Sequence, residues 1–199
     1  MKKGYRVLIR KPSDLQLEEK KKKTSNSSLI SKIAISSVLM ALGAVLKFFG
    51  IMITSNMRLS FFAIPLILSG LLNGLGFGLL TSLGADLLYS LISGYAFNPA
   101  FTISALYWGI LGAVFSRIAK KKGNLSIFVI FLGVLLTSLL ETHTNIIVTY
   151  ILYGSGTTML VLLTKYLVLI IKLPIIVGVI KLLYERLIKG MLKQKGEYQ

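Results

Sequence analysis

One run of sequence decides the fold: LSFFAIPLILSGLLNGLGFGLLTSLGADLLYSLISGYAFNPAFTISALYWGILGAVFS, residues 59–116. Asp86 is its single charged side chain, and Arg58 and Arg117 flank it. A water-soluble fold needs charged residues along most of its helices, whereas a chain in the hydrocarbon of a bilayer keeps only those charges that have a function. The run therefore predicts membrane-spanning segments, and its one carboxylate needs an explanation.

The composition of the whole chain indicates an integral membrane protein, because 54% of the 199 residues are hydrophobic. A net charge of +16 suggests nucleic acid in a soluble chain, but here nine of the 23 basic residues lie in the first 23 positions. No basic face with interleaved aromatic residues accompanies them, so we interpret them as topology signals and predict no nucleic-acid partner. The absence of cysteine excludes disulfides and Cys-based metal sites.

The chain divides into three parts. Residues 1–27 are polar and Lys-rich and predict a cytoplasmic leader without a fold of its own, residues 28–188 form the membrane domain, and residues 189–199 form a cytoplasmic tail. Within the membrane domain, turn residues separate six apolar spans at about 29–49, 59–73, 76–93, 101–118, 126–150 and 158–184. The second span is too short to cross about 30 Å of hydrocarbon as a straight helix and contains Pro65, so we expect it to be tilted, kinked or incomplete.

The basic residues also predict the orientation, because short cytoplasmic loops are rich in Lys and Arg. With the N-terminus inside, six crossings place the loop Arg117–Lys122 inside, together with a C-terminal tail that carries Arg186, Lys189, Lys193 and Lys195. Five or seven crossings would put one of these clusters outside. We therefore predict an all-α bundle of six transmembrane helices in the cell membrane, with both termini cytoplasmic. The glycines and serines on the second and third spans predict close helix packing: Gly70, Gly74, Gly78, Ser82 and Gly84.

Enzymatic signatures are missing from the sequence. It contains no glycine-rich phosphate loop, so nucleotide hydrolysis by the chain itself is not predicted. His143, the single histidine, lies two residues from Glu141, and positions two apart on a helix point to different faces. The sequence therefore predicts neither a catalytic residue nor a metal site.

The topology places a group of polar and aromatic residues at the outer end of the bundle, as a solute pocket requires. They are Lys47, Arg58, Tyr95, Phe97, Asn98, Phe101, Glu141, Asn145 and Lys165. Aromatic faces can hold a flat ring and cations can hold carboxylates. Lys47 and Arg58 could instead extend toward the outer headgroups.

Lys172 and Asp86 lie deeper in the predicted bundle than the residues of the outer end. Lys172, near the middle of the last span, should face the interior and meet a carboxylate or a ligand, because an unpaired lysine there costs at least about 2–3 kcal/mol. The same expectation holds for Lys165. For Asp86 the sequence leaves two roles equally open, a contact with a ligand or a structural pairing of helices.

Several motifs resemble the substrate-binding S components of energy-coupling factor transporters, most closely the folate-specific branch. They are Arg58-Leu-Ser-Phe-Phe-Ala-Ile-Pro65, Gly70, Gly74–Gly78, Gly84-Ala-Asp86-Leu-Leu, Tyr95-Ala-Phe-Asn-Pro99-Ala-Phe101-Thr-Ile-Ser-Ala105, Gly109, Gly112, Thr144-Asn145, Leu152-Tyr153-Gly154, Lys165 and Lys172-Leu-Pro174. The resemblance covers about residues 30–185.

The resemblance implies a six-helix membrane subunit that captures a vitamin from outside. It also implies docking to a transmembrane coupling protein and two ATPases, so that ATP is used by the partners and the chain needs no cofactor. In that family, small residues four apart on the first helix form the docking face; the matching positions here are Ser37 and Ala41, with Ala34 and Ala44 nearby.

Folate suits the residues at the outer end. Its flat pterin can stack on aromatic rings and use Asp86, Glu141 or Asn145, while its glutamate tail can meet Arg58, Lys47 or Lys165. Three alternatives remain: an S component for riboflavin or a thiamine precursor, an ion-coupled secondary transporter or channel in which Asp86 exchanges a proton or cation, and a structural or lipid-handling membrane protein.

Overall fold

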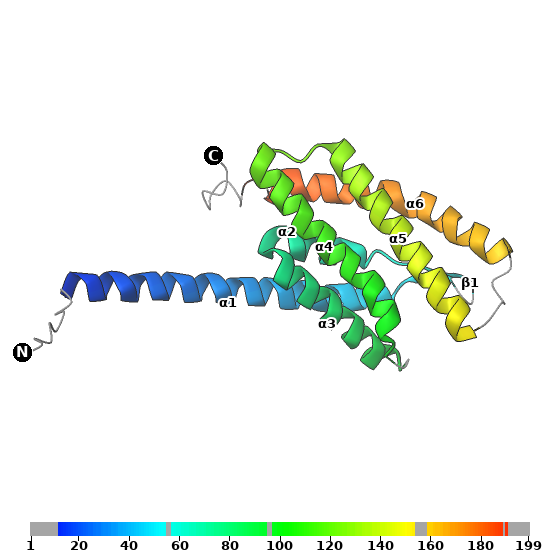
Figure 1. Ribbon diagram of the computed structural model, residues 1–199, viewed down its shortest axis with the longest axis horizontal. Coiled ribbons are helices and arrows are strands. Elements are labelled where there is room, and N and C mark those ends of the chain that lie inside the picture. The colour runs from blue at the N-terminus through cyan, green and yellow to red at the C-terminus, as the bar shows by residue number, and fades with distance from the viewer. Residues whose placement is uncertain (1–11, 55–56, 95–96, 154–158, 189, 191–199) are drawn as a thin grey trace, which may run out of the picture.

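The computed structural model describes residues 12–188 and 190, except 55–56, 95–96 and 154–158. Its elements follow one another as α1 Pro12–Phe48, β1 Ile51–Thr54, β2 Met57–Leu59, α2 Ala63–Asn73, α3 Leu75–Ser93, α4 Pro99–Lys122, α5 Ile127–Tyr153 and α6 Met159–Leu183, which the π-helical turn Tyr184–Ile188 extends. In Figure 1 the helices lie side by side in a bundle, and α1 runs far beyond it toward the N-terminus. The all-α fold class predicted from the sequence is confirmed.

Five of the described helices are long and apolar enough to cross a membrane: α1, α3, α4, α5 and α6. Their outward faces carry large apolar side chains, such as Leu91 at 79% exposure and Ile151 at 73%. In water such exposure would be unfavourable, whereas lipid tails accept it, and helices satisfy their own backbone polar groups. The protein is therefore a multi-pass membrane protein.

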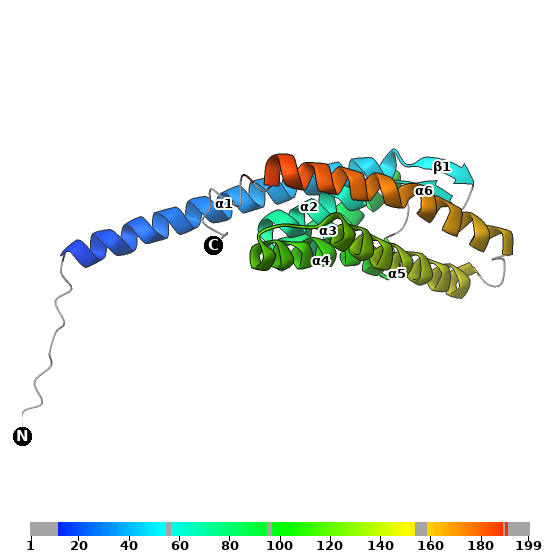
Figure 2. The same cartoon turned by 90° about the horizontal axis from the view of Figure 1, so that it is seen from above.

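The short helix α2 lies at the centre of this bundle. It contacts α1, α3, α4 and α6, and Figure 2 shows it between these longer helices. Its side chains Leu66, Ile67 and Leu71 are fully buried. With 11 residues α2 is about 16 Å long, so of the three expectations for the second span (tilted, kinked or incomplete) the last is confirmed. Pro65 does not kink it, because this proline lies in the first turn, where no backbone donor is needed.

A short antiparallel hairpin of β1 and β2 connects α1 with α2, and the sequence did not predict it. Ile51 pairs with Leu59 and Met52 with Arg58. The hydroxyl of Ser60, just after β2, donates to the carbonyl of Leu46 at 2.9 Å and so fixes the end of the hairpin to α1. The hairpin thus lies at the same end of the bundle as the N-terminus of α2.

The first helix begins earlier than the predicted apolar span. It takes in residues 12–27, where the sequence analysis expected no fold, while residues 1–11 lie outside the described part of the chain. The segment Leu15–Lys23 consists of Leu, Gln, Glu and Lys, which all have high helix propensity, so it can extend a helix that the membrane span has already nucleated.

Three helices approach one another at backbone distance, as the small residues predicted. A Cβ atom added to Gly70 would lie 2.3 Å from the carbonyl oxygen of Gly109, and one added to Gly78 would lie 2.7 Å from the same oxygen. On α4, a Cβ at Gly112 would lie 2.1 Å from the carbonyl oxygen of Ile67. Glycines are therefore required where α2, α3 and α4 cross. Gly74 instead ends α2 with φ +88° and has open space around it.

One end of the bundle collects basic residues. Lys120, Lys121 and Lys122 form the last turn of α4, and Lys181 donates to the carbonyl of Leu125 at 2.9 Å, which brings α6 to the turn between α4 and α5. By the charge rule this is the cytoplasmic end, called the inner end below. The hairpin and the N-terminus of α4 lie at the opposite, outer end (Figure 1).

Candidate functional site

The lone carboxylate of the apolar run is paired with a lysine. Asp86 on α3 accepts from the Lys47 ammonium of α1 through Oδ1 and from the Thr102 hydroxyl of α4 through Oδ2, the latter at 2.5 Å. Asp86 is buried, and the Lys47 nitrogen also lies 5.4 Å from the centre of the Phe62 ring and 4.7 Å from that of Tyr89. Because both carboxylate oxygens have partners on neighbouring helices, the geometry favours helix pairing as the role of Asp86.

A second lysine and carboxylate pair joins α5 to α6. The Lys172 nitrogen lies 3.0 Å from Oε2 of Glu141, and both side chains are largely buried. The expectation that Lys172 faces the interior and meets a carboxylate is confirmed. The same nitrogen lies 5.5 Å from the Phe62 ring centre and 5.2 Å from that of Trp108. A buried ammonium close to aromatic rings gains cation–π stabilisation.

The two pairs meet at one ring. Phe62, which precedes α2 and is 8% exposed, lies at nearly equal distances from the ammonium groups of Lys47 and Lys172. The candidate site is therefore a central cluster of two cations, two anions and aromatic rings, contributed by all six helices or their ends. Its formal charge is balanced, which lowers the cost of holding charges inside a membrane protein.

Hydrogen bonds between α4 and α5 border this cluster. The Ser104 hydroxyl donates to Oδ1 of Asn145 at 2.7 Å, and the hydroxyls of Tyr107 and Thr144 lie 3.3 Å apart. Glu141 and Asn145, predicted to share a face of one helix, thus both face the bundle, the first toward α6 and the second toward α4.

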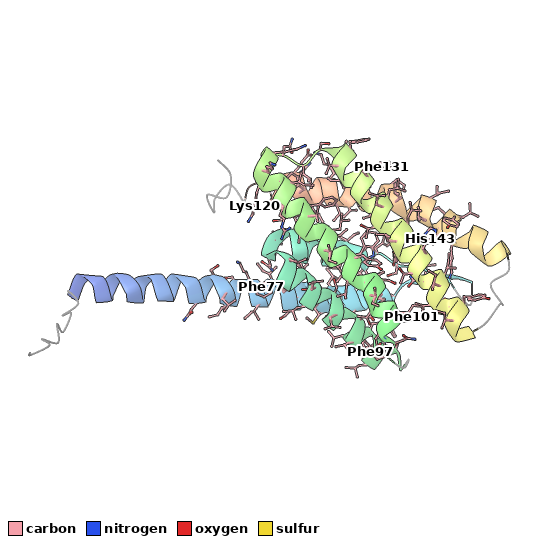
Figure 3. The ribbon with its side chains drawn as sticks, viewed as in Figure 1. Phe77, Phe97, Phe101, Lys120, Phe131 and His143 are labelled. Carbon is pink, nitrogen blue, oxygen red and sulfur yellow. The ribbon has the colours of Figure 1, made fainter. Side chains whose placement is uncertain are left out.

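The predicted turn before α4 is placed at the outer end. The side-chain oxygen of Asn98 accepts from the backbone N–H of Ala100 at 3.0 Å and caps α4, so it has a structural use. Phe97 is 41% exposed and Phe101 is half-buried. Both lie at the end of α4 that is far from Lys120 (Figure 3).

Three other predicted residues are placed less fully. Arg58 belongs to β2, but its side chain lies outside the described part of the structure, as does Tyr95 entirely. Lys165 lies in the outer half of α6 and is half-buried, and no ion pair joins it to another described residue. The expectation that Lys165 meets a carboxylate or a ligand stays a prediction.

The residues predicted for docking lie on α1. Ala34, Ser37 and Ala41 are exposed, and Val38 between them is 67% exposed. Ala44 is 1% exposed and packs inside the bundle, so it does not share their surface. The docking face itself stays a prediction.

Sequence reasoning missed the residues that connect the predicted ones. Phe62, Trp108 and Thr102 sit in apolar or hydroxyl-rich stretches without any local signal of function. A clue was available for Trp108, because it is the single tryptophan and lies on the helix that follows the predicted turn.

The comparisons with known proteins agree with this architecture. The family model of the substrate-specific component of ECF (energy-coupling factor) transporters matches residues 31–184. The chain belongs to this family. The matched range spans the membrane-embedded part of α1 through α6 and contains every residue of the central cluster. No curated protein gives a significant match.

As an S component the chain is a transport protein and not an enzyme. It binds a substrate and works with the ECF module, which consists of a coupling protein and ATPases. A chain that leaves ATP hydrolysis to its partners needs no phosphate loop, which explains the absence of that motif from the sequence.

Proposed function

We propose that this S component captures folate, or a reduced folate, from the outer side of the membrane and delivers it through the ATPase-driven module. The observation that carries the proposal is the Phe62 ring between Lys47 and Lys172, 5.4 and 5.5 Å from the two nitrogens. Aromatic rings beside ammonium groups suit the flat part of a ligand, and Lys165, which forms no ion pair with a described residue, suits an anionic part. Folate combines a flat pterin with a glutamate that carries two carboxylates.

The charges of the cluster support a proposed orientation for folate. Glu141 is bound to Lys172, and Asn145 to Ser104, through one oxygen each, so a carboxylate and an amide border the rings and can pair with the donors and acceptors of a pterin. Lys165 forms no ion pair with a described residue and lies in the outer half of α6. We assign it to the glutamate tail, whose carboxylates form charge-assisted hydrogen bonds with lysine.

Isothermal titration calorimetry of the detergent-purified protein tests the assignment, with folic acid, a reduced folate, riboflavin and thiamine as separate ligands. Saturation at submicromolar concentration by the folates alone is expected. Saturation by riboflavin or thiamine instead would refute the folate assignment and leave the family membership intact.

Variants then test the site. Lys165→Met should weaken folate binding about 10- to 100-fold, since a hydrogen bond to a charged group contributes about 1.5–3 kcal/mol. Lys122→Met, at the exposed inner end of α4, is the matched control and should bind like wild type. Equal affinity of both variants would remove Lys165 from the site.

Reconstitution separates the proposal from an ion-coupled carrier. Vesicles that contain this chain alone, with proton and sodium gradients imposed, should bind folate without accumulating it. Accumulation of folate against its gradient without ATPases would contradict the proposal that this chain only binds the substrate and that the ATPase module drives transport.

A further inference from the structure

Two buried polar atoms have no hydrogen-bond partner among the described residues, Nε1 of Trp108 and Oγ of Ser138. Trp108 is 0% exposed and Ser138 is 3% exposed. A buried donor left unsatisfied is unfavourable, and more than nine in ten buried polar groups in proteins find a partner. In a membrane, lipid cannot supply one. The orphan indole N–H therefore needs an explanation.

Its position shows that it belongs to the central cluster. The Lys172 ammonium lies 5.2 Å from the Trp108 ring centre, and the same ammonium is bound to Glu141. One helical turn toward the outer end, Ser104 of α4 holds Asn145 of α5. The indole thus lies beside an ion pair, and one turn along the same helix is the serine that holds the amide we have assigned to a flat ring.

We propose that the indole N–H of Trp108 donates a hydrogen bond to an acceptor atom of the bound vitamin, a carbonyl oxygen or a ring nitrogen of its flat heterocycle. This inference rests on the proposed function and assigns Trp108 as a specificity-determining residue of that site. An acceptor on a neutral ring fits better than a carboxylate, because Lys172 and Glu141 already balance the charge around the indole.

The same geometry explains why the chain keeps an unsatisfied donor. A site built to donate one hydrogen bond discriminates against ligands that lack the acceptor, because the donor then stays unpaired after binding. In the free protein the unpaired indole N–H is unfavourable, and a ligand that accepts its hydrogen bond removes this free-energy cost. Binding of the correct ring should therefore change the environment of this one N–H directly.

A single tryptophan makes the test direct. Protein labelled with ¹⁵N-tryptophan gives one indole N–H resonance, which can be followed while folic acid, riboflavin or thiamine is added to saturation. A downfield shift of the indole proton is expected with the ligand that saturates the site. An unmoved resonance at saturation would overturn the inference and leave the proposed function standing.

A pair of variants provides the second readout. Trp108→Phe keeps an aromatic ring for Lys172 but removes the donor, and it should weaken binding about 3- to 10-fold, as expected for one neutral hydrogen bond. Leu71→Ala, fully buried near the inner end of α2, controls for the cavity and should leave the affinity unchanged. Equal losses of affinity in both variants would show that Trp108 contributes only by packing, and the proposed hydrogen bond would be refuted.

The outcomes separate the two proposals. If riboflavin saturates the protein and moves the indole resonance, the role of Trp108 stands and the folate assignment fails. If none of the three ligands binds, both fail.

Discussion

The pairing of Lys47 with Asp86 makes a quantitative prediction about stability. Lys47→Met removes the ammonium but keeps an unbranched apolar chain that can pack on Phe62 and Tyr89. It leaves the Asp86 carboxylate, whose side chain is 5% exposed, with Thr102 as its remaining partner among the described residues. Breaking a buried ion pair from one side costs about 3–5 kcal/mol, and an uncompensated Asp at the centre of a membrane helix costs a similar amount.

The expected loss for Lys47→Met is therefore about 3 kcal/mol. For a chain of this size, each kcal/mol lowers the melting temperature by about 2–4 °C, so the variant should melt about 6–12 °C below wild type. The double variant Lys47→Met/Asp86→Asn removes both charges and keeps an oxygen that can accept from Thr102. It should recover most of the loss.

Thermal unfolding in detergent, followed by the emission of Trp108, measures all three proteins under one condition. Lys122→Met, an exposed lysine, is the control and should change the melting temperature by less than about 1–2 °C. The pairing argument fails if Lys47→Met melts like wild type, or if the double variant melts no higher than Lys47→Met.

Two further predictions concern packing and topology. Gly109→Ala places a Cβ atom 2.3 Å from the carbonyl oxygen of Gly78 and should destabilise the protein by about 1–3 kcal/mol, whereas Gly76→Ala, with nothing within 4 Å, should be neutral or stabilising in the same unfolding assay. Equal melting of the two variants would contradict the close helix crossing. In whole cells, Phe97→Cys should react with a membrane-impermeant thiol reagent and Lys121→Cys only after permeabilisation, because the wild-type chain has no cysteine and basic turns stay inside. The opposite pattern would invert the topology.

The sequence predicted the helices well because their signal is local. Long apolar runs bounded by Gly, Asn and Pro indicate spans, and the short length of α2, together with Pro65, predicted that it is tilted, kinked or incomplete. The hairpin was missed because residues 50–58 were treated as a connection between two spans, and their pairing depends on the chain reversing between two helices. The helical start of α1 was missed because polar composition was given more weight than helix propensity.

The charged residues of the candidate site could be named from the sequence, but the lysine and carboxylate pairs that they form could not. Intramembrane ionisable residues are rare, so Lys47, Asp86, Glu141 and Lys172 stand out in the sequence. Which lysine meets which carboxylate depends on how four helices are rotated about their axes, and no spacing along the chain encodes that rotation. Aromatic partners such as Phe62 are ordinary core residues until the lysines are placed beside them.

The glycine crossings have a consequence for motion. Where Gly70, Gly78, Gly109 and Gly112 bring backbones together, no layer of side chains lies between α2, α3 and α4 that could change rotamers and let one helix slide. We therefore expect these three helices to move as one rigid body. Helices α5 and α6 pack on this body through side chains, so we expect the bundle to open first at the interface between α5–α6 and α2–α4.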